Sequence, residues 1–106
     1  MINYELRDST FEVHYGNLLE NNTNFWPWVE IITEVYNRGK RLYRLDIHLF
    51  PNAQDYRKVG IRIGDNKIKW YASLNDFETS LWKQRHKKYV IALLGKYRNN
   101  LAEILL

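Results

Sequence analysis

Cysteine is absent from this chain of 106 residues. Disulfides, thiolate zinc sites, iron–sulfur clusters and cysteine nucleophiles are therefore excluded. Long apolar runs are absent too, since the longest one, Tyr89–Leu94, has six residues where a membrane-spanning helix needs about 20. Proline and glycine are scarce, at two and five residues, and no linker rich in them divides the chain. We expect a single compact domain over residues 1–106, with no membrane partner.

Several short functional motifs are also missing. The three histidines, His14, His48 and His86, have no second ligand at the spacing of a local zinc or iron pair. No serine lies in a G-x-S-x-G motif, and no phosphate loop or dinucleotide fingerprint is present. These absences predict that the chain uses no metal and no cofactor. The N-terminus lacks the basic and apolar segments of a secretory signal, which favours a cytoplasmic location.

Charge is distributed unevenly along the chain. Residues 1–36 contain one basic residue against six acidic ones, a net charge of −5. Residues 37–106 contain fifteen basic residues against six acidic ones, a net charge of +9. The modest total of +4 hides this asymmetry. A basic surface concentrates anionic partners, so the later part of the chain favours nucleic-acid binding, with an ordinary solvated surface as the alternative.

The N-terminal residues alternate between apolar and polar side chains. Residues 2–6 and 11–15 each show the period of two that is typical of a half-buried strand. Asp8 and Ser9 lie between these stretches and can form a turn. We therefore expect two short strands joined as a hairpin, followed by an asparagine-rich loop over residues 16–24.

The segment 25–38 has two interpretations. Its many β-branched residues favour a strand. Its apolar residues also fall at helical spacing, with charged residues on the opposite face. Pro27 is tolerated in a first helical turn, and Gly39 suits the position after a helix end. We predict a helix over 25–38 and keep the strand as the alternative.

Three strands are predicted next, over residues 41–50, 59–63 and 68–72. Alternation defines the first, and the turn residues 64–67 join the other two as a hairpin. The side chains predicted to face inward are Val59, Ile61, Ile63, Ile68, Trp70 and Ala72. Those predicted to face outward are Lys58, Arg62, Lys67, Lys69 and Tyr71.

The C-terminal segment has the apolar stripe of a helix that starts near Asn75, where a capping box with Glu78 is possible. One straight helix over 76–105 would be about 45 Å long, which exceeds the size of so small a domain. We therefore expect a break at Gly95 or near the pair Lys87-Lys88. In the second case Tyr89–Leu94 could be a buried strand.

Together these elements predict an α+β fold. It contains an antiparallel sheet of four to five strands, with one helix before the central hairpins and one or two C-terminal helices. This order of strand, helix, three antiparallel strands and helix resembles the layout of RelE-like toxins. The resemblance implies a metal-independent ribonuclease in which His48 is the acid or base and Arg44 and Arg62 clamp the phosphate. No catalytic motif accompanies it.

A non-catalytic binding role is the interpretation that we favour. Cationic side chains contact phosphates, and exposed aromatic rings stack on bases. Trp26 is predicted to contact a protein partner, because tryptophan dominates many interfaces. We expect a small basic protein that acts on nucleic acid, or that inhibits or adapts a nucleic-acid-handling protein, like accessory proteins of phages and plasmids. The residues predicted to contact nucleic acid are Arg44, Arg62, Lys67, Lys69, Tyr71, Lys87 and Lys88.

Overall fold

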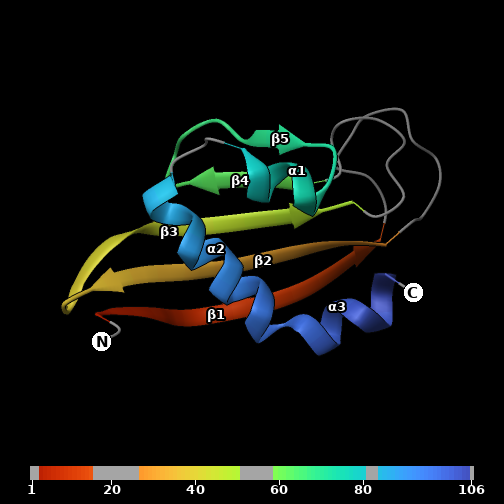
Figure 1. The fold of residues 1–106 in the computed structure, drawn as a ribbon. Helices are drawn as coiled ribbons and strands as arrows, with labels where there is room; N and C mark the ends of the chain where they lie inside the picture. The colour runs from red at the N-terminus through yellow and green to blue at the C-terminus, as the bar shows by residue number, and fades with distance from the viewer. Residues whose placement is uncertain (1–2, 16–26, 51–58, 81–83, 106) are drawn as a thin grey trace.

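Five antiparallel strands are followed by three helices (Figure 1). The computed structural model describes residues 3–15, 27–50, 59–80 and 84–105. The strands are β1 (Tyr4–Tyr15), β2 (Pro27–Asn37), β3 (Lys40–Leu49), β4 (Val59–Ile63) and β5 (Lys69–Tyr71). The helices are α1 (Leu74–Thr79), α2 (Gln84–Lys96) and α3 (Arg98–Leu105).

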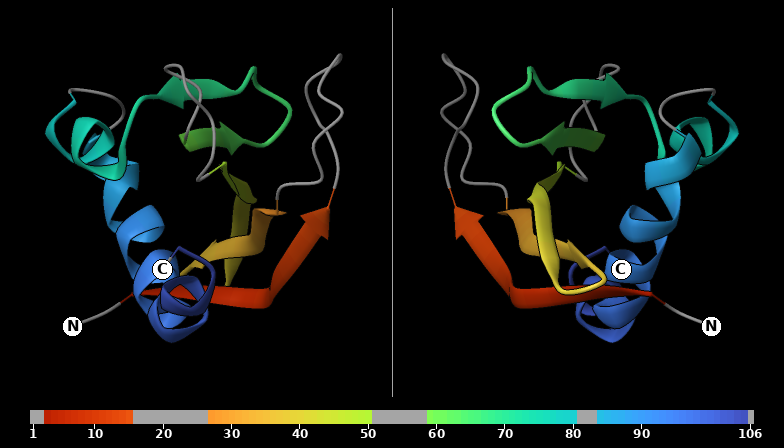
Figure 2. Two further views of the ribbon diagram at one scale, coloured as in Figure 1. Left: turned by 90° about the vertical axis from the view of Figure 1, so that its right-hand side faces the viewer. Right: turned by 90° about the vertical axis from the view of Figure 1, so that its left-hand side faces the viewer.

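The sheet is a simple meander in which the strand order β1-β2-β3-β4-β5 is also the chain order. Figure 2 shows that the sheet curves strongly and that the helices lie on its concave side. Alternate residues of each strand therefore face the helices, and we call this side of the sheet the core face. The buried core consists of Val29, Ile31, Val35, Leu45, Ile47, Leu49, Val59, Ile61, Ile63, Phe77, Tyr89, Val90, Leu93 and Leu101.

Aromatic contacts fix helix α2 across the sheet. The Tyr89 ring meets Tyr4 of β1 edge to face, with a centroid distance of 4.9 Å, and lies 6.3 Å from Tyr43 of β3. The Tyr43 hydroxyl forms a hydrogen bond of 2.7 Å with Nδ1 of His86. His86 is thus a packing residue of the helix. None of the described helices is both long and apolar enough to cross a membrane.

The prediction of a helix over residues 25–38 is wrong, because residues 27–37 form strand β2. Val29, Ile31 and Val35 are fully buried on the core face. The alternate residues Glu30 and Glu34 face the other side, where they meet His14 of β1 and Arg41 of β3. Pairing with two neighbouring strands thus overrides the local helical spacing. The predicted fold class is wrong in the same respect, since every helix of the described chain follows the sheet.

The prediction of an N-terminal hairpin is also wrong, because residues 4–15 form one strand. The register against β2 shifts between Arg7 and Thr10, which marks a β-bulge, and Asp8 has a positive φ of 54°. The buried Thr33 hydroxyl donates a 3.0 Å hydrogen bond to the Arg7 carbonyl and lies 2.9 Å from the Ser9 hydroxyl. The bulge therefore uses the residues that were expected to turn the chain.

The hairpin around residues 64–67 is confirmed, since β4 and β5 pair in antiparallel register. The faces predicted for β5 are reversed, however. Tyr71 lies opposite Val59, and its ring contacts Phe77 at 5.3 Å. Trp70 lies opposite Gly60 on the far side of the sheet. The missing side chain of Gly60 gives the indole ring its space, because a Cβ at this position would lie 2.8 Å from Cζ3 of Trp70.

The C-terminal helices begin and end at positions that differ from the prediction. Ser73, rather than Asn75, caps α1 by accepting a 3.0 Å hydrogen bond from the Asp76 amide. Lys87 and Lys88 lie inside α2, so neither a break there nor a strand over Tyr89–Leu94 is formed. The chain instead breaks between α2 and α3 at Tyr97, two residues beyond Gly95.

The space above Gly60 yields a stability prediction. Gly60→Ala should destabilise the protein by about 1–3 kcal/mol, because the new methyl group overlaps Trp70 and Ile68. Gly95→Ala is the matched control. Gly95 lies inside helix α2 with nothing within 4 Å of an added Cβ, so that change should stabilise the protein by about 0.5–1 kcal/mol. Urea denaturation followed by tryptophan fluorescence measures both, and equal effects of the two substitutions would contradict the packing argument.

Candidate functional site

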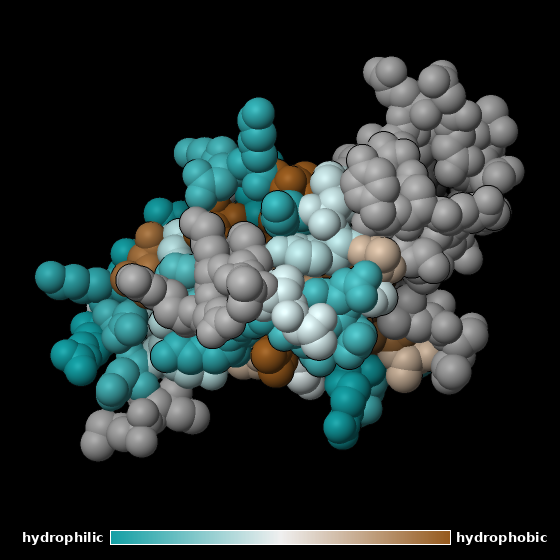
Figure 3. All heavy atoms as spheres, turned by 45° about the horizontal axis from the view of Figure 1, so that its top comes forward, coloured by the Kyte–Doolittle hydropathy of each residue, from teal (hydrophilic) through white to brown (hydrophobic). Residues whose placement is uncertain are grey.

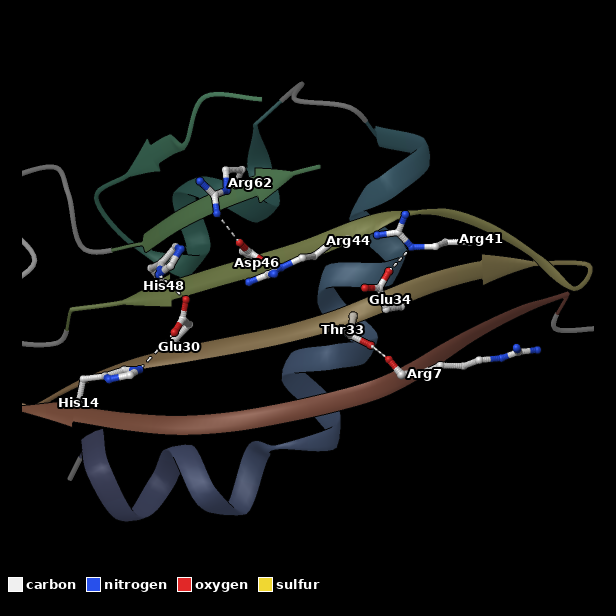
Figure 4. Close-up of polar contacts among 10 residues, drawn as sticks. All are labelled: Arg7, His14, Glu30, Thr33, Glu34, Arg41, Arg44, Asp46, His48 and Arg62. Atoms are coloured by element: carbon white, nitrogen blue, oxygen red, sulfur yellow. Dashed lines mark hydrogen bonds and ion pairs between the residues drawn. The ribbon is translucent and has the colours of Figure 1, made fainter. Parts of the chain in front are cut away.

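Charged and polar side chains cover the face of the sheet opposite the helices (Figure 4). We call this side the polar face. It brings together the acidic first third of the sequence and the basic remainder, because β2 and β3 pair in antiparallel register. Glu34 lies opposite Arg44 and forms an ion pair with Arg41. Much of the charge asymmetry along the sequence is therefore neutralised by strand pairing.

Asp46 is the buried centre of the polar face. Its side chain is 1% exposed. Oδ1 accepts a 2.9 Å hydrogen bond from Nε of Arg44, and Oδ2 accepts a 2.8 Å hydrogen bond from Nη2 of Arg62. The hydrogen bond to Asp46 raises the pKa of the Arg44 guanidinium above its ordinary value. One carboxylate thus fixes two guanidinium groups and leaves one positive charge in excess.

The two guanidinium groups keep donors for a further partner. The side chains of Arg44 and Arg62 are 46% and 38% exposed, so both reach solvent. Nε of Arg62 is buried and has no hydrogen-bond partner in the described part of the chain, so only the outer N–H groups of this guanidinium can reach a further partner. A guanidinium carries five N–H donors, and each of these two uses only part of that set on Asp46. The arrangement is a preorganised pair of cations with unused donors.

His48 is buried beside this pair. It is 5% exposed and lies opposite Glu30 in the register of β2 and β3. Its Nδ1 is 4.0 Å from Oε2 of Glu30, and neither ring nitrogen has a hydrogen-bond partner among the described residues. Burial lowers the pKa of the imidazole below its ordinary value of 6.5. Burial therefore favours the neutral form of the His48 ring.

A second cluster lies on the polar face at the edge of β1. Glu12 and Glu30 are directly opposite each other in the strand register. Nε2 of His14 lies 3.2 Å from a carboxylate oxygen of each. Two like charges in this position destabilise a sheet unless a cation lies between them. These three residues offer ligand atoms that all lie within 4.8 Å of one another, so together they can hold a metal ion.

The sequence prediction of no metal site did not anticipate this cluster. The sequence predicts a helix for the segment that contains Glu30, whereas the ligand atoms come from two strands, β1 and β2, whose register the sequence does not specify. The available signal was local and weak. Glu12 and His14 are two residues apart, which places them on one face of a strand.

A row of aromatic rings crosses the sheet at this end of the polar face. His14 stacks on Trp28 at 4.3 Å, Trp28 on Phe50 at 5.1 Å, and Phe50 contacts Trp70 at 5.7 Å. Trp28 and Phe50 are each 9% exposed. Trp28 also lies 6.0 Å from the His48 ring. The row thus removes water from one side of His48 and holds the His14 ring in place.

The seven residues predicted to contact nucleic acid do not form one surface. Only Arg44 and Arg62 share the polar face. Lys69 and Tyr71 belong to the opposite face of β5, and Lys67 is exposed in the turn before that strand. Burial raises the pKa of the Tyr71 hydroxyl.

The helix lysines are engaged locally. Nζ of Lys87 donates to the carbonyls of Glu78, at 2.7 Å, and Ser80. Nζ of Lys88 lies 5.8 Å above the Tyr4 ring and 5.3 Å above the Tyr89 ring. Trp26, the predicted protein contact, and Lys58 lie outside the described residues.

Comparison with known proteins gave no assignment: no family model matches the chain, and neither the curated proteins nor the solved structures contain a match. The resemblance to RelE-like toxins loses its basis, since it depended on a helix between the first and second strands. In the structure β2 occupies that position.

Asp46→Asn tests the centre of the polar face. The amide keeps the shape but removes the charge that holds Arg44 and Arg62, so the protein should lose about 1–3 kcal/mol of stability. The loss stays below that of a fully buried pair because solvent screens both guanidinium groups.

Glu5→Gln is the matched control for this test. It removes the carboxylate of an exposed ion pair with Arg7 and should leave the unfolding free energy unchanged. Chemical denaturation measures both variants. If Asp46→Asn is as stable as the parent, the carboxylate does not organise this face.

Proposed function

We propose that this chain is a non-catalytic binding domain whose polar face contacts the phosphate backbone of nucleic acid. The observation that carries the proposal is the Arg44–Asp46–Arg62 arrangement. Two guanidinium groups are held in place by one buried carboxylate, and both remain partly exposed. Preorganised guanidinium groups bind phosphate oxygens through paired, charge-assisted hydrogen bonds. A cytoplasmic location, where nucleic acid is accessible, is part of the proposal.

One further exposed cation follows Arg62 in the chain. Lys67 lies in the turn after β4, whereas Lys69 is exposed on the opposite face of the edge strand β5. Neither has an ion-pair partner in the described ranges. Figure 3 shows the molecule from the side of the helices and from above, where hydrophilic side chains cover much of the visible described surface and the hydrophobic patches are small and separate. Phosphate contacts carry affinity but no base identity, so we expect binding that depends weakly on sequence.

The burial of His48 favours binding over catalysis. A general acid or base must come within hydrogen-bond distance of the proton that it transfers. His48 is 5% exposed and lies beside Glu30 and Trp28. An RNA backbone that contacts Arg44 and Arg62 therefore has little access to this imidazole. The ribonuclease alternative remains an outcome of the test below.

The salt dependence of binding tests the proposal. Fluorescence anisotropy with labelled single-stranded RNA and DNA, across a salt series in EDTA, should give affinities that fall steeply with salt. The double variant Arg44→Gln/Arg62→Gln should bind more weakly. Its slope of log affinity against log salt should fall by about 1.4, or about 0.7 for each phosphate that the variant no longer neutralises.

The control variant is Lys40→Gln/Arg98→Gln, which removes the same charge at the start of β3 and the start of α3. This control variant should retain most of the parent protein's slope of log affinity against log salt. An equal loss in both double variants would refute the polar face as the contact surface. No binding to either polymer at low salt would refute the proposal and favour a protein partner. RNA cleavage in EDTA that His48→Ala abolishes would instead establish a metal-independent ribonuclease.

A further inference from the structure

We propose that Glu12, His14 and Glu30 form a binding site for a divalent transition metal, with Zn²⁺ as the best-fitting ion, and that His48 positions Glu30 for it. The proposal does not depend on nucleic-acid binding. It is carried by the geometry of these four residues on β1, β2 and β3.

Two of the three distances between ligand atoms suit a zinc ion, and all three atoms lie within 4.8 Å of one another. Nε2 of His14 lies 3.2 Å from Oε2 of Glu12 and 3.2 Å from Oε1 of Glu30. Zinc bonds of about 2.0–2.1 Å in tetrahedral geometry separate neighbouring ligand atoms by about 3.3 Å. An ion can therefore lie among these atoms after small side-chain rotations. The imidazole ligand favours zinc over magnesium, which prefers oxygen ligands.

Electrostatics also calls for a cation at this point. The strand register places Glu12 and Glu30 directly opposite each other, where two carboxylates repel. The stack on Trp28, at 4.3 Å, orients the His14 ring toward them. The Glu12 side chain is 52% exposed and that of Glu30 only 19%. The site is therefore open on the Glu12 side, where water can complete the coordination.

His48 supplies an independent observation. This imidazole is 5% exposed, and neither ring nitrogen has a hydrogen-bond partner within the described ranges. Its Nδ1 faces Oε2 of Glu30, the carboxylate oxygen that His14 does not contact. A buried polar group without a partner is costly. Carboxylates that ligate metals are themselves commonly hydrogen-bonded, and a shift of about 1 Å would bring Nδ1 to hydrogen-bond distance of Glu30.

Metal titration of the full chain tests this site. The protein is stripped with EDTA, freed of chelator and titrated with Zn²⁺ against a chromophoric chelator. We expect one zinc ion per chain and a rise in the unfolding temperature on binding. Co²⁺ in the same site should give the visible absorption of a four- or five-coordinate ion. Magnesium should not compete.

Substitutions assign the ligands. His14→Gln and Glu30→Gln should each weaken zinc binding by at least about 10-fold, and His48→Asn should weaken it by about 10–100-fold without removing the Co²⁺ spectrum. Circular dichroism of the metal-free variants confirms that they fold. If Glu30→Gln does not fold, Glu12→Gln takes its place in the test. Glu12 is the most exposed of the three ligands, so its substitution should disturb folding least.

Two control variants separate the site from adventitious binding. Glu5→Gln changes another exposed carboxylate of β1, and His86→Gln changes a histidine on α2, outside the cluster. Both should bind zinc as the parent does. The absence of saturable binding at about 100 μM free Zn²⁺ would overturn the proposal. So would a ligand variant that binds like the parent. Since no nucleic acid is present, either result leaves the binding proposal for Arg44 and Arg62 untouched.

Discussion

The antiparallel register between β2 and β3 determines which side chains of this protein meet. In this register Val29 lies opposite Leu49 and Ile31 opposite Ile47, which builds the centre of the core. The intervening residues place Glu30 opposite His48 on the other face. A slip of one residue would turn every side chain of a strand to the opposite face. The apolar core and the polar face are therefore specified by the same pairing, and each supports the other.

Strand pairing also explains why the charge pattern of the sequence is a poor guide to the surface. Acidic residues dominate the first third of the chain, and basic residues dominate the rest. In the fold they meet across β1, β2, β3 and β4. Asp46 shows the result most clearly, since it is almost fully buried and draws Arg44 and Arg62 toward itself. The two guanidinium groups beside Asp46 are fixed in position, and that position matters more for recognition than the net charge.

Part of the fold was predictable from local patterns. The strands near 41–50 and 59–63, the hairpin after them and the late helices follow from alternation, turn residues and an apolar stripe. The segment 25–38 was not predictable, because its residues separate equally well into strand faces and helix faces. Only the pairing with β1 and β3 decides between the two. The faces of β5 depend on the open space above Gly60, which the sequence of β5 does not encode.

The candidate sites divide in the same way. Alternation along one strand places Arg44, Asp46 and His48 on one face, so their common location could be predicted. The cluster of Glu12, His14 and Glu30 could not, because Glu30 lies 16 residues beyond His14. Its formation requires the register of β1 against β2. The prediction that Lys87 and Lys88 contact nucleic acid could not take account of their contacts within the fold. Lys87 donates hydrogen bonds to backbone carbonyls, and Lys88 forms cation–π contacts, neither of which can be read from the sequence.

The β-bulge in β1 reverses the phase of alternation in the middle of a continuous strand. Leu6 and Phe11 are five residues apart, so in a regular strand they would face opposite sides of the sheet. The extra residue between Arg7 and Thr10 brings both to the core face, opposite Val35 and Ile31. If the bulge were straightened with every residue kept, His14 would turn toward the core and Phe11 toward solvent. The cluster of Glu12, His14 and Glu30 would then be lost although all of its residues were still present. The bulge therefore determines which side chains of β1 face the core, in addition to kinking the strand.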